Sequence, residues 1–225
     1  YLIKTELLDY KIIMEKLIEP RIDCAKCKRL KEFRDYNKEK YPDWHNAPVS
    51  SFGKSNSELL IVGLAPGLKG ANKTGRPFTG DYAGDLLYST LKKAKLSSGS
   101  YRSSINDELS LVNCTITNAV RCVPPQNKPI GSEIKNCSQY LRSTIKQHKN
   151  LKVIISLGHI SHKSVISTLD KKQSNYKFKH GMIHIIDNIS LIDSYHCSRY
   201  NTNTGRLTEE MFQKIFLLAN KILKK

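Results

Sequence analysis

Three stretches rich in glycine, proline and polar residues hold the side chains of this sequence that could perform chemistry. They read GLAPGLKGANKTGRPFTGD (63–81), NAVRCVPP (118–125) and SYHCSRYNTNTGRLT (194–208). Asp81 and His196 could act as acid, base or electrostatic partner. The glycines of the first stretch let the backbone approach a phosphate or a flat ligand closely, although glycine-rich loops are more often simple turns and the P-loop ending GK[ST] is absent.

Four of the six cysteines have the spacing of a metal site. Cys24 and Cys27 are separated by two residues, and Cys122 and Cys137 flank the start of a predicted helix. This spacing suits tetrahedral zinc and an iron–sulfur cluster about equally. Six cysteines are too sparse for a disulfide scaffold, and Cys114 falls in a predicted strand, where a small buried thiol is the ordinary interpretation.

The elements that must position these residues alternate between strand and helix. A helix is predicted over 2–19, then a polar stretch over 21–57 read as loop with short helical pieces. The later predicted strands cover 59–62, 111–117, 153–157, 183–186 and 190–195, and the later predicted helices cover 85–95, 132–147, 159–169 and 208–223. This alternation predicts an α/β fold with a parallel sheet between helices, in which loops that follow strands meet at one edge.

The chain is expected to form a single domain over residues 1–225. Within it, 1–20 would be the N-terminal helix and 21–58 the segment that carries Cys24 and Cys27. No internal repeat, low-complexity segment or linker divides the sequence.

Composition points to a globular protein with a polyanionic partner. Of 225 residues, 37 are Lys or Arg and 20 are Asp or Glu, giving a formal charge of +17, and 39% are hydrophobic. No apolar run is long enough for a membrane span, and the charged N-terminus does not resemble a signal peptide, so we expect neither membrane insertion nor secretion. The charge favours nucleic acid as the partner, with a basic surface kept for solubility as the alternative.

Taken together, the motifs resemble the uracil-DNA glycosylase superfamily, in particular the type b, or family 5, enzymes. The resemblance rests on GLAPG-(x)2-GAN-x-TGRPFTGD, NAVRC-VPP-(x)11-C and SYH-x-S-(x)2-NT-x-TGRLT, and spans Cys24 to about Phe212. The related family 4 enzymes would have an acidic residue at Leu64 and would lack both GANKTG and NTNTGRLT. The resemblance implies a four-stranded parallel sheet flanked by helices.

The resemblance also implies a cofactor. It makes Cys24, Cys27, Cys122 and Cys137 the ligands of a [4Fe–4S] cluster, which decides against zinc. Such a cluster would join the N-terminal segment to the loop after the second parallel strand, and we expect no redox turnover.

By resemblance, the base-binding residues are Gly63, Leu64, Ala65, Phe78 and Asn118. A base inside a duplex must be extruded before an enzyme can act on it. Phe78 would stack on the extruded base, and Asn118 would donate and accept hydrogen bonds along the uracil edge. The alternatives are an ordinary core phenylalanine and an asparagine that caps a turn.

Asp81 and His196 would be the catalytic pair. Cleavage of the N-glycosidic bond leaves positive charge on the sugar and negative charge on the base. The resemblance implies that Asp81 orients water and stabilises the sugar cation, and that His196 donates to uracil O2. The alternatives are a helix N-cap for Asp81 and a structural role for His196.

Arg199, Tyr200 and Arg206 are expected to contact DNA, because by resemblance this segment enters the minor groove and fills the vacated stack. Surface arginines of a basic protein are the alternative. The family usually has proline after the motif histidine, whereas Cys197 stands here, and a less rigid loop is expected.

The implied function is a monofunctional glycosylase that leaves an abasic site during base-excision repair. Substrates beyond uracil, such as hypoxanthine, xanthine or etheno-cytosine, fit the resemblance. We expect a monomer in the cytoplasm of a prokaryote, associated with the nucleoid through its substrate. The competing functions are a non-catalytic iron–sulfur module that binds nucleic acid or senses damage, and an iron–sulfur redox protein, which the +17 charge fits poorly.

Overall fold

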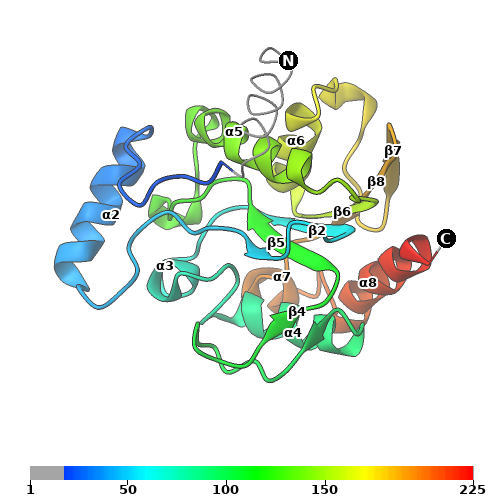
Figure 1. Ribbon diagram of the computed structural model, residues 1–225, viewed down its shortest axis with the longest axis horizontal. Coiled ribbons are helices and arrows are strands. Elements are labelled where there is room, and N and C mark those ends of the chain that lie inside the picture. Colours follow the sequence, from blue (N-terminus) through cyan, green and yellow to red (C-terminus); the bar gives the residue numbers. More distant parts are fainter. Residues whose placement is uncertain (1–17, 225) are drawn as a thin grey trace, which may run out of the picture.

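A central sheet of six strands brings the three motifs together. The computed structural model describes residues 18–224 and orders the strands β1-β5-β2-β6-β8-β7 (Figure 1). The strands are β1 (Phe52–Gly53), β2 (Leu59–Gly63), β5 (Cys114–Asn118), β6 (Val153–Leu157), β7 (Ile183–Ile186) and β8 (Ile189–Ser194). The four inner strands are parallel, as predicted, and the edge strands β1 and β7 pair antiparallel to their neighbours.

Helices cover both faces of this sheet (Figure 1). The helices are α2 (Lys28–Lys40), α3 (Ala71–Thr74), α4 (Tyr82–Lys93), α5 (Gly131–Gln147), α6 (His159–Thr168), α7 (Arg199–Asn203) and α8 (Glu209–Leu223). Helices α4 and α8 share one hydrophobic cluster with the sheet, and α5 and α6 share the other. Short 3-10 turns lie at η1 (Pro125–Asn127) and η2 (Gln173–Asn175), and β3 (Ser97–Ser98) pairs with β4 (Ser110–Leu111) in a separate hairpin.

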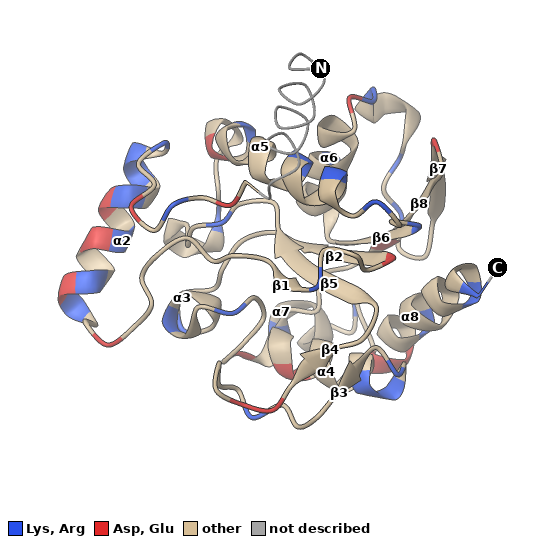
Figure 2. Cartoon of the chain, viewed as in Figure 1, with Lys and Arg blue, Asp and Glu red and all other residues tan. Residues whose placement is uncertain are grey.

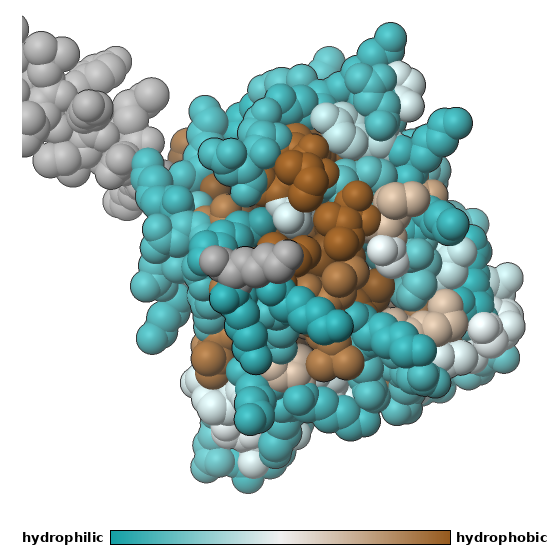
Figure 3. Space-filling view, turned by 90° about the vertical axis from the view of Figure 1, so that its right-hand side faces the viewer, coloured by the Kyte–Doolittle hydropathy of each residue, from teal (hydrophilic) through white to brown (hydrophobic). Residues whose placement is uncertain are grey.

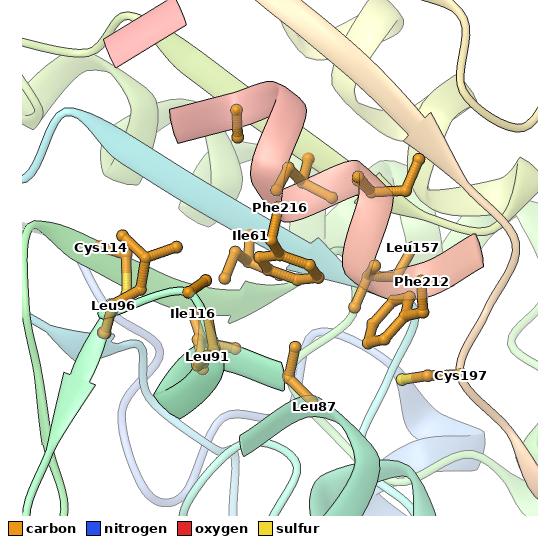
Figure 4. Packing of buried hydrophobic residues seen from close by; sticks show 14 of the residues in the cluster. Ile61, Leu87, Leu91, Leu96, Cys114, Ile116, Leu157, Cys197, Phe212 and Phe216 are labelled. Atoms are coloured by element: carbon orange, nitrogen blue, oxygen red, sulfur yellow. Dashed lines mark hydrogen bonds between the residues drawn. The ribbon is translucent and has the colours of Figure 1, made fainter. Parts of the chain in front are cut away.

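The apolar run of β2 explains why the sheet has two cores. Successive side chains of a strand point to opposite faces. Leu59 and Ile61 accordingly pack in the cluster below α8, and Leu60 and Val62 pack in the cluster below α5 and α6. Figure 4 shows the first cluster, in which Phe216 of α8 lies over the sheet residue Ile61. Burial on both faces is the expected environment of a parallel strand.

Several observed elements differ from the predicted ones, and the short elements β1, α3 and β3 were not predicted. The stretch 21–57 contains the 13-residue helix α2, where only loop with short helical pieces was expected. The strand expected over 111–117 begins at Cys114, because Leu111 belongs to the hairpin strand β4. The predicted helix 85–95 begins earlier, at Tyr82, and the segment after His196 forms the short helix α7. The helix predicted over 2–19 lies almost wholly outside the described residues.

The surface carries mixed charge and one apolar face. Lys and Arg are spread over several helices and loops, with Asp and Glu between them on α2 (Figure 2). Figure 3 shows an apolar face on the side of β7 and α8, where Ile185 is 66% exposed and Leu217 is 55% exposed. Within residues 18–224, no helix combines the length and apolar character that crossing a membrane requires.

Candidate active site

A large cavity lies where the inner strands end, at the edge of the sheet where the sequence predicted that the motif loops would meet. It has a volume of about 630 Å³ and receives residues from the loops after β2, β5 and β8. The cavity lining includes seven of the predicted site residues: Leu64, Ala65, Phe78, Asp81, Asn118, His196 and Arg199. Three motifs that are far apart in sequence therefore form one site.

Phe78 adopts a constrained conformation at the wall of this cavity. Its φ is +52°, in the left-handed region, which costs a non-glycine residue on the order of 1–3 kcal/mol. The ring is 7% exposed, and its centroid lies 6.0 Å from that of the His196 ring at an interplanar angle of 27°. The ring forms part of the core and also lines the cavity.

Gly63 permits the close approach of Phe78 and Asn118. A Cβ atom at Gly63 would lie 2.3 Å from Asn118 Oδ1 and 2.6 Å from the Phe78 ring. Any side chain at this position would displace one of them. Gly63 therefore contributes by leaving space at the end of β2.

Asn118 presents an unsatisfied acceptor at the end of β5. The residue is 2% exposed, and its Oδ1 atom has no hydrogen-bond partner among the described residues. Buried side-chain oxygens are normally paired, and leaving one unpaired costs about 1–3 kcal/mol. Asn118 lines the cavity, so a ligand there could supply the missing donor.

Asp81 lines the cavity, and its two carboxylate oxygens have different surroundings. Oδ1 accepts a hydrogen bond of 3.1 Å from the Gly84 amide, which makes Asp81 the N-cap of α4. Oδ2 lies against Gly70, where a Cβ atom would approach it to 2.3 Å. Burial raises the pKa of Asp81, partly offset by the hydrogen bond from Gly84. The N-cap alternative is thus correct for one oxygen, and the other remains near the glycine loop.

His196 is neutral at physiological pH. Burial lowers its pKa to about 4. Asn201 Nδ2 donates to the His196 carbonyl oxygen at 2.8 Å, and Ser198 caps α7 by accepting from the Asn201 amide. A neutral imidazole on a tethered loop can donate one hydrogen bond without introducing charge.

The predicted DNA-contacting residues occupy different places around the cavity. Arg199 lines it, with its guanidinium 5.3 Å from the centroid of the Tyr82 ring. Tyr200 is 73% exposed at the rim. Arg206 lies over Tyr195 at 4.8 Å and lines an adjacent hollow that also includes His196.

Sequence reasoning missed several lining residues. Gly67, Lys69, Tyr82, Asn127 and Ser198 also face the cavity. Asn127 follows two prolines and has a φ of +56°, a conformation that asparagine tolerates, so a turn at this point was detectable. Tyr82 follows the predicted acid directly, and only the early start of α4 brings it to the cavity.

Cys197, which stands where the family usually has proline, packs the histidine loop against the core. It is fully buried, and its Sγ atom donates to the Ala83 carbonyl oxygen at 3.5 Å. Figure 4 places its side chain beside Phe212 and Leu87. A thiol is small and apolar enough to join this cluster, so the loop is held by packing instead of by a proline ring.

The four paired cysteines converge on a second, small cavity. Cys24, Cys27, Cys122 and Cys137 all line it. Within residues 18–224, the only group of three or more possible metal ligands whose ligand atoms lie close together is His162, His184 and Asp193.

Buried arginines beside these cysteines have unused donors. Arg34 is 3% exposed and its Nε and Nη1 atoms have no partner among the described residues, and the same holds for Nε of the fully buried Arg121. Burial raises the pKa of Cys122 to about 12, while the charge of Arg34 opposes this shift. Guanidinium groups with spare donors are the counterpart that several thiolates bound to metal would require.

The His162 trio is satisfied without a ligand. The two ring nitrogens of His162 face Asp193 Oδ1 at 2.7 Å and the Tyr176 carbonyl oxygen at 2.8 Å, and both of these are acceptors. His162 must therefore carry two protons. Burial alone would lower the pKa of His162, but the Asp193 carboxylate raises it overall. His184 Nε2 lies 3.1 Å from the second carboxylate oxygen, which ties β7 to β8 and α6.

Comparisons with known proteins agree with this site. The family model "Uracil DNA glycosylase superfamily" matches residues 50–219. The chain is 36% identical to a type-5 uracil-DNA glycosylase of Thermus thermophilus, over 92% of this chain and 97% of the relative. It is 35% identical to the type-5 enzyme of Pyrobaculum aerophilum (88% of each chain) and 34% identical to a type-4 enzyme of Sulfurisphaera tokodaii (92% and 84%). The chain therefore belongs to the uracil-DNA glycosylase superfamily, in its type-5 branch.

Proposed function

We propose that this protein removes uracil from DNA by hydrolysing the N-glycosidic bond, leaving an abasic site. The observation that carries the proposal is the buried Oδ1 atom of Asn118, which has no donor among residues 18–224 and belongs to a residue that lines the cavity together with Phe78. Uracil offers the matching group, an N3–H donor next to the O4 acceptor. Cytosine reverses this pattern at the same edge, so an amide in this position would discriminate between the two bases.

The geometry supports base extrusion into a preformed pocket. Extruding a base costs a few kcal/mol, and stacking in the pocket recovers part of it. The Phe78 ring is held in place by its constrained backbone and by contact with Gly63, so it need not reorganise when the base arrives. Preorganisation of this kind reduces the entropy lost on binding.

His196 and Asp81 would act at opposite ends of the breaking bond. As the bond breaks, negative charge develops at uracil O2, and the neutral His196 would donate a hydrogen bond there. The Asp81 carboxylate would stabilise the sugar cation and orient water with Oδ2, because Oδ1 caps α4. The leaving group is the uracil anion, whose charge is shared between N1 and O2, so the N1–C1′ bond can break before any proton moves. When water then bonds to C1′ of the sugar cation, Asp81 Oδ2 would take its proton, which finally passes to the uracil anion.

DNA contacts would come from Arg199, Tyr200 and Arg206. Arg199 and Arg206 lie on either side of the His196 loop, and the exposed ring of Tyr200 stands between them in the sequence. Arginines at such a rim can bind phosphates, and an exposed aromatic ring can enter the space that an extruded base leaves.

We further propose that Cys24, Cys27, Cys122 and Cys137 hold a [4Fe–4S] cluster. The convergence of the four cysteines on one small cavity supports it, as do the buried donors of Arg34 and Arg121 that have no partner among the described residues. The cluster would join the segment before α2 to α5 and to the loop after β5. The purified protein should then be brown with iron in excess of zinc. A colourless protein with one zinc would overturn this assignment.

The central experiment is single-turnover incubation with a duplex containing one U·G pair, followed by alkali to break abasic sites. We expect cleavage at uracil and none in the matched C·G duplex. Asn118→Ala should lower the preference for uracil over cytosine, because the edge contact is lost. Binding without cleavage by folded, iron-loaded protein would favour the non-catalytic nucleic-acid-binding module instead.

The monomeric state, the prokaryotic cytoplasmic location and the single-domain organisation remain predictions, as does activity on hypoxanthine, xanthine or etheno-cytosine. The same cleavage assay extends directly to duplexes that contain those bases.

A further inference from the structure

The loop that presents Phe78 is enclosed by an unusual set of buried groups. Arg76, two residues before Phe78, is 4% exposed, and both of its terminal nitrogens donate to Asp107, at 2.7 and 2.8 Å. The guanidinium also lies 5.0 Å from the centroid of the Phe52 ring and 5.8 Å from that of Tyr101. A buried ion pair of this quality is expensive to assemble, and stability alone rarely requires one.

Hydrogen bonds of Arg76, Tyr88 and Tyr101 hold the loop on both sides of Phe78. Arg76 Nε donates to Thr79 Oγ1 at 2.8 Å, and Tyr88 Oη donates to the Pro77 carbonyl oxygen at 2.6 Å. After Phe78, the Gly80 amide donates to Tyr101 Oη at 3.2 Å. The left-handed residue is therefore fixed at the positions before and after it.

Asp107 and Tyr101 both come from the segment between the hairpin strands β3 and β4. Asp107 also accepts from the backbone amides of Arg102 and Leu109, at 2.9 and 3.1 Å, which fixes its carboxylate in this segment. The Arg76 guanidinium holds the pKa of Asp107 well below its usual range. The Asp107 carboxylate is therefore ionised at neutral pH. Its ion pair with Arg76 connects the segment between β3 and β4 to the loop that carries Phe78.

We propose that Arg76, Tyr101 and Asp107 form a positioning clasp that holds Phe78 in its left-handed conformation and so sets the rate of base excision. The clasp rests on the proposed function for its effect on catalysis. None of its members lines the cavity, so they act through Phe78 and not on the base. Its energetic role is to offset the backbone strain at Phe78, which would otherwise relax and move the ring.

The test compares Asp107→Asn with Asp170→Asn. Asp170 pairs with Arg142 in the same bidentate manner, at 2.5 and 2.7 Å, but on the surface and away from the cavity. We expect Asp107→Asn to slow single-turnover cleavage on the order of 10²-fold, as a small misplacement of a positioning group does, with unchanged affinity for undamaged DNA. Asp170→Asn should match wild type. Wild-type cleavage by folded Asp107→Asn would overturn the clasp.

A double-mutant cycle separates positioning from general destabilisation. If the clasp acts through Phe78, adding Asp107→Asn to Phe78→Ala should slow cleavage by no more than about twofold beyond Phe78→Ala alone. Fully multiplicative effects would show that Asp107 acts elsewhere and would reject the proposal. Should Asp107→Asn fail to fold, Tyr101→Phe removes only the hydroxyl that binds the Gly80 amide, and the same cycle applies.

Amide hydrogen exchange tests the clasp independently of activity. In Tyr101→Phe and Asp107→Asn, the Gly80 amide should exchange faster than in wild type, while the amides of β6 remain protected. This readout stands even if wild type cleaves no uracil, which would refute the proposed function alone. Unchanged exchange at Gly80 in both variants would refute the clasp alone.

Discussion

At the scale of single residues, Asp81 illustrates how one side chain can serve structure and chemistry together. Oδ1 caps α4 and Oδ2 lies against Gly70. Substitutions can therefore separate the structural role of Asp81 from its chemical role. Asparagine caps helices about as well as aspartate but carries no charge. Asp81→Asn should therefore keep α4 intact while losing the electrostatic contribution.

We predict that Asp81→Asn lowers single-turnover cleavage on the order of 10²-fold or more without lowering thermal stability. Asp81→Ala should show the same loss of rate and, in addition, lose about 1 kcal/mol in the free energy of unfolding, because the cap is gone. Cleavage kinetics and thermal unfolding of the two variants check this. Near-normal cleavage by Asp81→Asn would reduce Asp81 to a helix cap.

The same residue should govern the acidic limb of the pH profile. Burial raises the pKa of Asp81, and the proposed role requires its ionised form. The single-turnover rate should therefore fall as the pH falls through the raised pKa of Asp81. In Asp81→Asn this limb should vanish, because asparagine has no carboxyl group to protonate. An unchanged limb in Asp81→Asn would assign it to another group.

The sequence predicted the site residues whose types carry chemistry and missed those whose role depends on loop path. Asn118 and His196 stand at or just after strand ends, Asp81 stands at the start of α4, and all three belong to recognisable motifs. Tyr82 and Asn127 are ordinary residue types, and they reach the cavity only because α4 starts early and the loop after Pro125 turns back. Arg76 is a third case, because its partner Asp107 lies 31 residues away and no local pattern connects them.

At the scale of elements, the periodic spacing of hydrophobic residues predicted the sheet and its covering helices but not α2. The residues that α2 buries are Leu30, Arg34 and Asn37, so it has no apolar stripe to detect. Its helix-favouring composition and the pairs Lys28–Glu32 and Lys31–Asp35 support it instead. The location of α2 next to the cysteine cavity explains why it buries the guanidinium group of Arg34.

The histidine loop yields a prediction at this scale, because packing holds it through Cys197. Burial raises the pKa of the Cys197 thiol, and burial raises that of Cys114 to about 12. Neither should react with iodoacetamide in the folded protein, because the thiolate is the reactive form. After iron removal by a chelator, the partly exposed Cys24 and Cys27 should be labelled first. Peptide mass spectrometry reads the order, and early labelling of Cys197 would mean that the loop is mobile.

At the scale of the whole molecule, the charge of +17 decides how the protein meets its substrate. Such a charge attracts DNA over distances longer than any single contact, and it raises the rate of encounter. Only residues that touch phosphates release counterions on binding, however. The total charge and the contacts at the cavity rim can therefore be distinguished by salt dependence.

Two arginines with the same charge make this distinction. Arg206 lies at the rim beside His196, whereas Arg142 pairs with Asp170 away from it. The logarithm of the DNA-binding constant should fall linearly with the logarithm of salt concentration, with a slope of about −0.9 for each phosphate neutralised. Arg206→Gln should make this slope shallower by about 1, and Arg142→Gln should leave it unchanged, although each removes one positive charge.

Binding titrations by fluorescence anisotropy at several salt concentrations measure both slopes. Equal changes of slope in the two variants would mean that the total charge, and not contacts at the cavity rim, accounts for binding to the DNA backbone. A wild-type binding constant that does not change with salt concentration would contradict electrostatic binding altogether.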